Sequence, residues 1–152
     1  MDQSLLRALE RRRVQIRSRW KALLQIERVH TPLADPEILA HLFDQTLDEI
    51  LGALPGAAPG PAQPPPRSRC ACNPLRDYFP ALEQALLEAL VLAQAKQHKL
   101  SQDARVAAVD ELRTTLRRIA QREIAVYDAI CQQRARQPKE KLNRQKASAA
   151  II

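Results

Sequence analysis

The chain has 152 residues, the length of one ordinary domain, and 45% of them are hydrophobic. Only three residues are glycine and 3% are aromatic. Sandwiches and barrels need many glycine turns and many aromatic or β-branched strand residues, so the composition argues against an all-β fold. It favours an all-α fold, because Leu, Ala, Arg, Gln and Glu lose little rotamer freedom in a helix.

The net charge of +7 is unevenly distributed along the chain. Residues 1–30 hold eight Lys/Arg and three Asp/Glu, whereas residues 31–66 hold five acids and no Lys or Arg. The net charges of these two blocks, +5 and −5, cancel. If they form neighbouring helices, much of the basic charge faces an internal partner instead of nucleic acid.

The chain also lacks two hydrophobic patterns. Its first residues carry no apolar segment of the kind that a signal peptide requires. No run reaches the roughly 18 apolar residues of a membrane-spanning helix. We therefore expect a cytoplasmic protein with no membrane contact, in which the cysteines are reduced.

The first two helices are predicted from helical spacing. Leu5, Leu9, Ile16, Trp20 and Leu23 predict one helix from about Gln3 to Val29, with Arg12 and Arg13 filling the gap in its apolar stripe. The second begins with Asp35 as N-cap and Pro36 in the first position. Gly52 and Pro55 end it, and its apolar face is Leu39, Leu42, Phe43, Thr46, Leu47, Ile50 and Leu54.

The second half of the chain repeats the pattern after a linker. Residues 55–66 contain six prolines and two glycines, which predicts a semi-rigid linker over residues 55–69. A third helix starts with Asn73 as cap and Pro74 in the first position, and Pro80 predicts a short first turn or a kink. Ser101 caps a fourth helix that continues through Val126, Tyr127 and Ile130 to about Gln137.

These elements predict a four-helix bundle of two helical hairpins joined by the Pro-rich linker. The single domain covers residues 1–137. Pro138 closes the last helix, and the basic tail at residues 138–152 is predicted to be frayed helix or disordered.

The C-A-C sequence at Cys70 and Cys72 is the sharpest chemical feature. Two thiolates at this spacing can bind one soft metal ion, such as zinc or copper, or form a strained disulfide. An antiparallel hairpin that turns near Lys99 places Cys72 level with residue 126, so Cys131 lies within a turn or two of the pair. The alternative is that all three are structural residues, since buried cysteine is common.

Residues Arg11, Arg12, Arg13 and Arg17 give the first helix a basic surface. Such a helix can contact an acidic protein partner or the phosphates of nucleic acid. A helix-turn-helix signature is missing, and no aromatic residues are interleaved with the arginines. Because both features are missing, nucleic acid is a weaker candidate than a protein partner.

Catalytic patterns are missing from the sequence. It contains no glycine-rich phosphate loop, nucleophile elbow or H-E-x-x-H motif. Its serines have no His/Asp context. We therefore expect a protein that is not an enzyme and has no cofactor, unless the three cysteines bind metal.

Three segments resemble a known family. RRRVQIRSRWKALL (residues 11–24) is followed by ILAHLFDQTLDEIL (38–51) and LRDYFPALEQALLEAL (75–90). Together they resemble the RsbRD-type N-terminal domain, the helical input module of stressosome co-antagonists and some bacterial sensor histidine kinases. The Pro-rich linker and C-A-C depart from that family, and we expect the chain to act without a phosphoacceptor or kinase domain.

The resemblance implies a bacterial signalling or sensor domain that acts through binding alone. The first functional hypothesis is therefore a non-catalytic regulatory module that binds a protein partner, a second copy or a small ligand. The alternatives are a metal-binding or thiol-redox protein using the three cysteines, and a basic nucleic-acid-binding protein.

Overall fold

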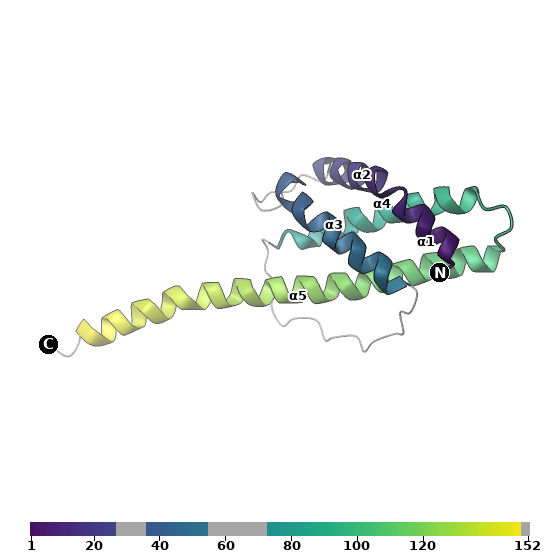
Figure 1. The fold of residues 1–152 in the computed structure, drawn as a ribbon. Coiled ribbons are helices and arrows are strands. Elements are labelled where there is room, and N and C mark those ends of the chain that lie inside the picture. The colour runs from purple at the N-terminus through teal and green to yellow at the C-terminus, as the bar shows by residue number, and fades with distance from the viewer. Residues whose placement is uncertain (27–35, 55–72, 150–152) are drawn as a thin grey trace.

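The computed structural model describes residues 1–26, 36–54 and 73–149, and within these ranges the chain is helical and contains no strand. The all-α prediction is therefore confirmed for this part of the chain. In chain order its helices are α1 (Gln3–Glu10), α2 (Arg13–Ile26), α3 (Pro36–Ala53), α4 (Leu75–Ala95) and α5 (Gln102–Ala149). Figure 1 shows a body in which all of them pack together, with the second half of α5 extending beyond it.

The predicted single helix over residues 3–29 is wrong, because the chain bends between α1 and α2. At the bend the Arg12 N–H donates to the Leu9 carbonyl, three residues back, at 2.9 Å. Positions three and four residues after Leu9 would continue the buried face, but both are arginines. The bend keeps these charges out of the core and still buries Leu9 and Ile16 on either side of it.

The predicted helix starts agree with the structure where it describes them. Helix α3 begins at Pro36 and ends at Ala53, two residues before Pro55; the proposed cap Asp35 lies outside the described residues. At the start of α4 the Leu75 N–H donates to Asn73 Oδ1 at 3.0 Å. Ser101 Oγ accepts the Ala104 N–H at 3.2 Å in the same way at α5. Proline and short polar side chains thus set these helix starts locally.

Pro80 lies inside α4, which continues through it as one helix. It falls in the second turn, where the missing N–H leaves only the Arg76 carbonyl without its helical donor. One lost hydrogen bond near a helix start is outweighed by the buried face that follows.

The turn between α4 and α5 has no glycine, and the described residues contain no positive φ angle. Carbonyl oxygens at the end of α4 and in the turn instead find a donor on α5. Arg105 donates to the carbonyl oxygens of Gln94 and Gln97, each at 3.0 Å, and to that of Leu100 at 3.3 Å. One guanidinium therefore caps the end of the preceding helix.

Helix α5 continues through Pro138 to Ala149, so the predicted end near Gln137 is wrong. A proline inside a helix kinks or breaks it at a cost of about 3 kcal/mol, and it does not always end it. The predicted linker at residues 55–69 lies outside the described part of the chain.

The direction of each helix follows from the pairs that join them. Arg13 pairs with Asp48 and Arg17 with Asp44, so α2 and α3 are antiparallel. Likewise Ser4 pairs with Gln97 and Trp20 with Tyr78, so α1 and α2 run antiparallel to α4. Helices α3 and α4 therefore run in the same direction, and α5 runs against both (Figure 1). The segment between α3 and α4 joins opposite ends of the body.

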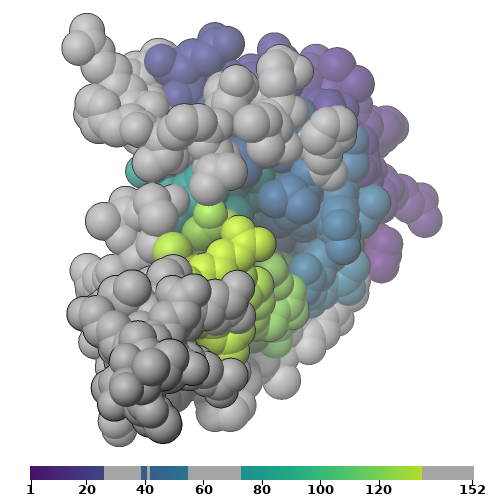
Figure 2. Space-filling view, turned by 90° about the vertical axis from the view of Figure 1, so that its left-hand side faces the viewer, coloured from purple at the N-terminus to yellow at the C-terminus, as the bar shows by residue number. Residues whose placement is uncertain are grey.

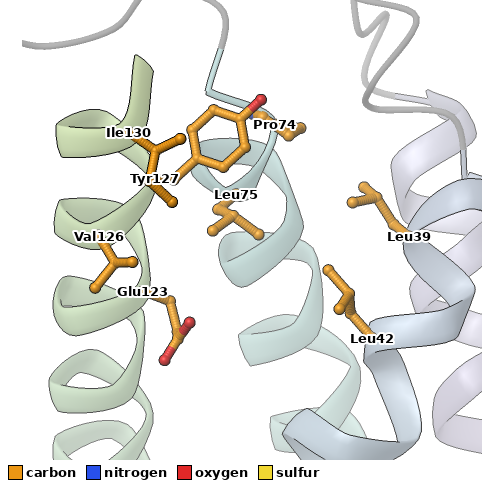
Figure 3. Close-up of a pocket in the computed structure, with 8 residues that line it drawn as sticks. All are labelled: Leu39, Leu42, Pro74, Leu75, Glu123, Val126, Tyr127 and Ile130. Atoms are coloured by element: carbon orange, nitrogen blue, oxygen red, sulfur yellow. The ribbon is translucent and has the colours of Figure 1, made fainter. Parts of the chain in front are cut away.

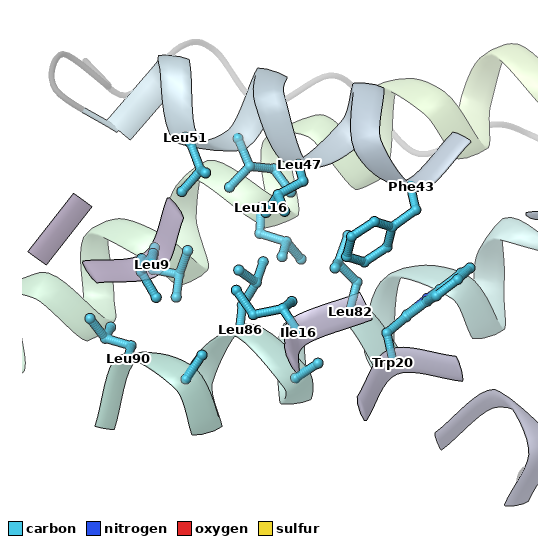
Figure 4. Packing of buried hydrophobic residues seen from close by; sticks show 14 of the residues in the cluster. Leu9, Ile16, Trp20, Phe43, Leu47, Leu51, Leu82, Leu86, Leu90 and Leu116 are labelled. Atoms are coloured by element: carbon cyan, nitrogen blue, oxygen red, sulfur yellow. The ribbon is translucent and has the colours of Figure 1, made fainter. Parts of the chain in front are cut away.

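The core lies between α4 and the other four helices (Figure 4). Its largest buried side chains are those of Trp20, Tyr78 and Phe43, followed by leucines and isoleucines from α1 to α4. The Trp20 ring centroid lies 5.1 Å from both the Phe43 and the Tyr78 centroid. The prediction that Trp20 belongs to the core is confirmed.

Ion pairs join most neighbouring helices across the surface of the body. On α2, Arg13 and Arg17 pair with Asp44 of α3, so the basic and acidic blocks of the sequence do face each other. Further arginine–carboxylate pairs are Arg19–Glu88, Arg113–Glu83 and Arg122–Glu49. Exposed pairs contribute at most about 1 kcal/mol each, so their main effect is to favour one register over others.

Tyr78 is buried, and its hydroxyl has no hydrogen-bond partner in the described part of the chain. Burial disfavours the phenolate and raises the pKa of Tyr78 to about 12. In the unfolded chain the same group loses its proton near pH 10. Between these values the folded state holds a proton that the unfolded state has released, so stability falls as the pH rises.

We therefore expect the wild type to lose on the order of 2 kcal/mol between pH 10 and 12, beyond what Tyr78→Phe loses over the same range. Urea unfolding at several pH values measures the difference. At pH 7 Tyr78→Phe should be nearly neutral, because the hydroxyl that it removes is unpaired. Parallel pH profiles for the two proteins would contradict the assignment.

Within the described ranges, no helix combines the length and the apolar content needed to cross a membrane.

Candidate functional site

An apolar groove of about 340 Å³ lies where α3, the start of α4 and α5 meet. Figure 2 views the end of the molecule at which these helices come together. In Figure 3 the α3 side chains point across the gap toward α4 and α5, and the Tyr127 ring lies beside Pro74. The lining residues are Leu39, Leu42, Pro74, Leu75, Glu123, Val126, Tyr127 and Ile130.

One wall of the groove is a regular stripe on α5. Glu123, Val126, Tyr127 and Ile130 follow the i, i+3, i+4, i+7 spacing of one helix face. Val126 is 52% exposed and Ile130 is 48% exposed, and Leu42 on the facing wall is 45% exposed. Large apolar side chains that are half exposed and adjacent are typical of a binding surface.

A buried polar cluster fixes the start of α4 beside this stripe. Asp128 on α5 is fully buried and accepts hydrogen bonds from Asn73 Nδ2 at 2.8 Å and from Arg76 at 2.7 Å. Asn73 Nδ2 also donates to the Ile124 carbonyl at 3.2 Å. The cluster therefore holds Pro74 and Leu75, which are part of the groove, against α5.

A second contact fixes α3 against α5. Arg122 donates to both carboxylate oxygens of Glu49, at 2.7 and 2.9 Å, and to Glu123 at 2.7 Å. These hydrogen bonds, with that to Glu123 the largest cause, raise the pKa of the Arg122 guanidinium. Arg122 therefore ties Glu49 of α3 to α5 next to Glu123, which lines the groove.

The lining of this groove is almost entirely apolar. Among its lining residues only Glu123 and Tyr127 have polar side chains. An apolar cavity of 300–1,000 Å³ with a few polar groups is typical of ligand and peptide sites.

The predicted cysteine site is only partly described. Cys70 and Cys72 lie outside the described residues, and Cys131 is half-buried on α5. The predicted antiparallel pairing of the third and fourth helices is confirmed at Asn73, the first described residue after Cys72. Its side chain donates to the Ile124 carbonyl and to Asp128. Within the described ranges no group of three or more His, Cys, Asp or Glu side chains is arranged to hold a metal ion. The metal or redox role stays a prediction.

The predicted arginine surface is divided by the bend between α1 and α2. Arg13 and Arg17 pair with carboxylates of α3. Arg11 donates to the Arg7 carbonyl at 3.2 Å, and Arg12 donates to Gln15 at 3.2 Å. A nucleic-acid or partner contact through these four residues stays a prediction, and Arg13 and Arg17 would have to leave their carboxylates to make it.

The groove itself was not predicted, because sequence periodicity placed Leu42 on an apolar helix face and carried the fourth helix through Val126, Tyr127 and Ile130 without showing what covers them. Periodicity shows which side chains share a helix face. It does not show whether another helix covers that face. The one usable signal was that the apolar stripe of α5 continues beyond the level at which α4 begins.

Comparison of the chain with models of known protein families, with characterised proteins and with solved structures finds no match in any of the three. The resemblance to the RsbRD-type domain therefore stays a prediction.

Proposed function

We propose that the chain is a non-catalytic regulatory module that binds a helical segment of a partner protein in the groove between α3, α4 and α5. The observation that carries this proposal is the half-exposed stripe of Val126, Tyr127 and Ile130 facing Leu39 and Leu42. The signalling role implied by the family resemblance and the cytoplasmic location expected from the sequence belong to the same proposal.

In this proposal the helices form one four-helix bundle, in which α1 and α2 together occupy the position of a single helix. Support comes from the contacts between neighbours, since α4 packs on α1, α2 and α5, and α3 packs on α2 and α5. The Pro-rich linker joins the two halves. The groove is then the place where α3 and α5 separate at one end of the bundle.

A helix is the occupant that the groove fits best. Its two walls are themselves helices with apolar residues three and four positions apart, which present ridges that another helical stripe can fill. Helical peptides bind such grooves through anchors at i, i+3, i+4 and i+7. The half-exposed walls allow a chain to enter from the side, which a closed small-molecule cavity does not.

Fluorescence anisotropy with a labelled probe peptide tests the proposal. The probe is a helical 20-residue peptide with leucines at i, i+3, i+4 and i+7 and a neutral polar remainder; its control has the same composition with the stripe scrambled. We expect the striped probe to bind at least about tenfold more tightly than the scrambled one, the effect of losing roughly 1.4 kcal/mol.

Charged substitutions in the groove should abolish that binding. Ile130→Asp and Leu42→Asp each place a carboxylate among the apolar anchors, and the half-exposed positions allow the protein to fold. The matched control is Val106→Asp, because Val106 is on the same helix, is 50% exposed and does not line the groove. Equal binding by Ile130→Asp and Val106→Asp, or no preference for the striped probe, would overturn the proposal.

A further inference from the structure

Beyond the groove, α5 forms an arm with a distinct charge. The basic arm is defined as residues 134–149, the part of α5 that follows Ile130 and Cys131 out of the body. In Figure 1 it extends past the ends of the other described helices. Its 16 residues correspond to about 24 Å of helix.

The sequence makes this arm strongly positive. It contains six Lys/Arg residues and one glutamate, a net charge of +5. Its cations are Arg134, Arg136, Lys139, Lys141, Arg144 and Lys146. Most of the chain's net charge of +7 is therefore concentrated on one helical segment.

The arm and the groove are continuous. The stripe of Val126, Tyr127 and Ile130 and the arm belong to the same helix, α5. The stripe ends at Ile130, four residues before the arm begins. A helix lying in the groove alongside α5 therefore runs onto the arm at its outer end. Inside the body, by contrast, Arg13, Arg19 and Arg122 are paired with carboxylates.

From these observations we infer that the partner is an amphipathic helix whose apolar stripe fills the groove and whose adjoining segment is acidic and lies along the basic arm. This inference rests on the proposed function and adds the chemistry of the partner. The apolar contact supplies most of the affinity. The charge complementarity selects acidic partners and raises the association rate.

The helical arm itself favours a protein partner over nucleic acid in this arrangement. A nucleic-acid site would need the positive charge alone, and the half-exposed apolar stripe that leads into the arm would stay unused. An acidic amphipathic helix uses both surfaces at once. Duplex DNA is therefore the competing occupant in the experiment.

The experiment extends the striped probe by four glutamates, placed before the stripe in one peptide and after it in another, because the partner can lie in either direction. Matching peptides carry four glutamines. We expect one of the acidic probes to bind at least about tenfold more tightly than its glutamine counterpart at low salt. The gain should shrink at 0.5 M NaCl, where the screening length is only a few ångströms.

Charge reversal of the arm separates this inference from the proposed function. The triple variant Lys139→Glu, Lys141→Glu, Arg144→Glu should lose the gain from the acidic flank and keep wild-type affinity for the glutamine probe. Ile130→Asp should lose affinity for both probes. If the glutamine probe does not bind the wild type, the proposed function fails.

If the glutamine probe binds and the acidic flank adds nothing, only the inference fails. A 20-base-pair DNA duplex serves as the competing probe. If it binds more tightly than either acidic probe, and equally well to Ile130→Asp, the arm is a nucleic-acid surface and the inference is overturned.

Discussion

Replacing Trp20 with alanine should lower the free energy of unfolding by about 3–5 kcal/mol, the range for deleting a large buried aromatic side chain. Trp20 is fully buried, and its ring packs against Phe43 of α3 and Tyr78 of α4 with centroids 5.1 Å away. Its loss leaves a cavity where three helices meet. Because the cavity is bounded by three helices, the movement of any one helix cannot fill it.

Chemical denaturation followed by far-UV circular dichroism measures this loss in a way that does not need the indole. A matched control is Val14→Ala on the same helix, because Val14 is 80% exposed and surface changes stay within about 0.5 kcal/mol. If Trp20→Ala is too unstable to measure, Trp20→Phe keeps part of the ring and should lose less. A loss below about 1 kcal/mol for Trp20→Ala would show that the aromatic cluster is not the centre of the core.

The features that the sequence predicts well are those decided by neighbouring residues. Pro36, Asn73 and Ser101 act within one helical turn, through a fixed φ angle or a side-chain oxygen that accepts a backbone N–H. The same holds for the apolar spacing that identified Trp20 as a core residue. These predictions need no knowledge of where the other helices lie.

Other features depend on contacts between distant segments, and sequence patterns miss them. The bend between α1 and α2 arises because Leu9 and Ile16 are both buried, whereas the two arginines between them would lie on the same face of a straight helix. Arg105 reads as one more surface cation, yet it caps the end of α4. The groove exists because α3 and α5 separate beside Val126 and Ile130, which periodicity alone cannot show.

Asp128 is the clearest case of a residue whose role is invisible in the sequence. It lies among apolar residues on α5, where a charged residue would be expected to face water. Instead it is fully buried and bound to Asn73 and Arg76 at the start of α4. A buried carboxylate of this kind is retained only where its hydrogen bonds are satisfied.

Replacing Asp128 with alanine should therefore lower the free energy of unfolding by about 3 kcal/mol, the lower end of the range for breaking a buried ion pair from one side. The lower end applies because Arg76 is partly exposed and regains water. Equilibrium urea unfolding measures the loss. Glu123→Ala is the matched control on the same helix, since Glu123 is half-buried and pairs at the surface.

The conservative variant distinguishes charge from shape at this position. Asp128→Asn keeps the volume and one acceptor for Asn73, so its loss should be smaller, about 1–2 kcal/mol. In a double-mutant cycle with Arg76→Ala, the pair should show a coupling energy between about 0.5 and 3 kcal/mol. Equal losses for Asp128→Ala and Glu123→Ala, with no coupling to Arg76, would mean that the cluster does not hold α4 on α5. The same cluster positions Pro74 and Leu75, so Asp128→Ala should also weaken binding of the striped probe peptide, although Asp128 does not line the groove.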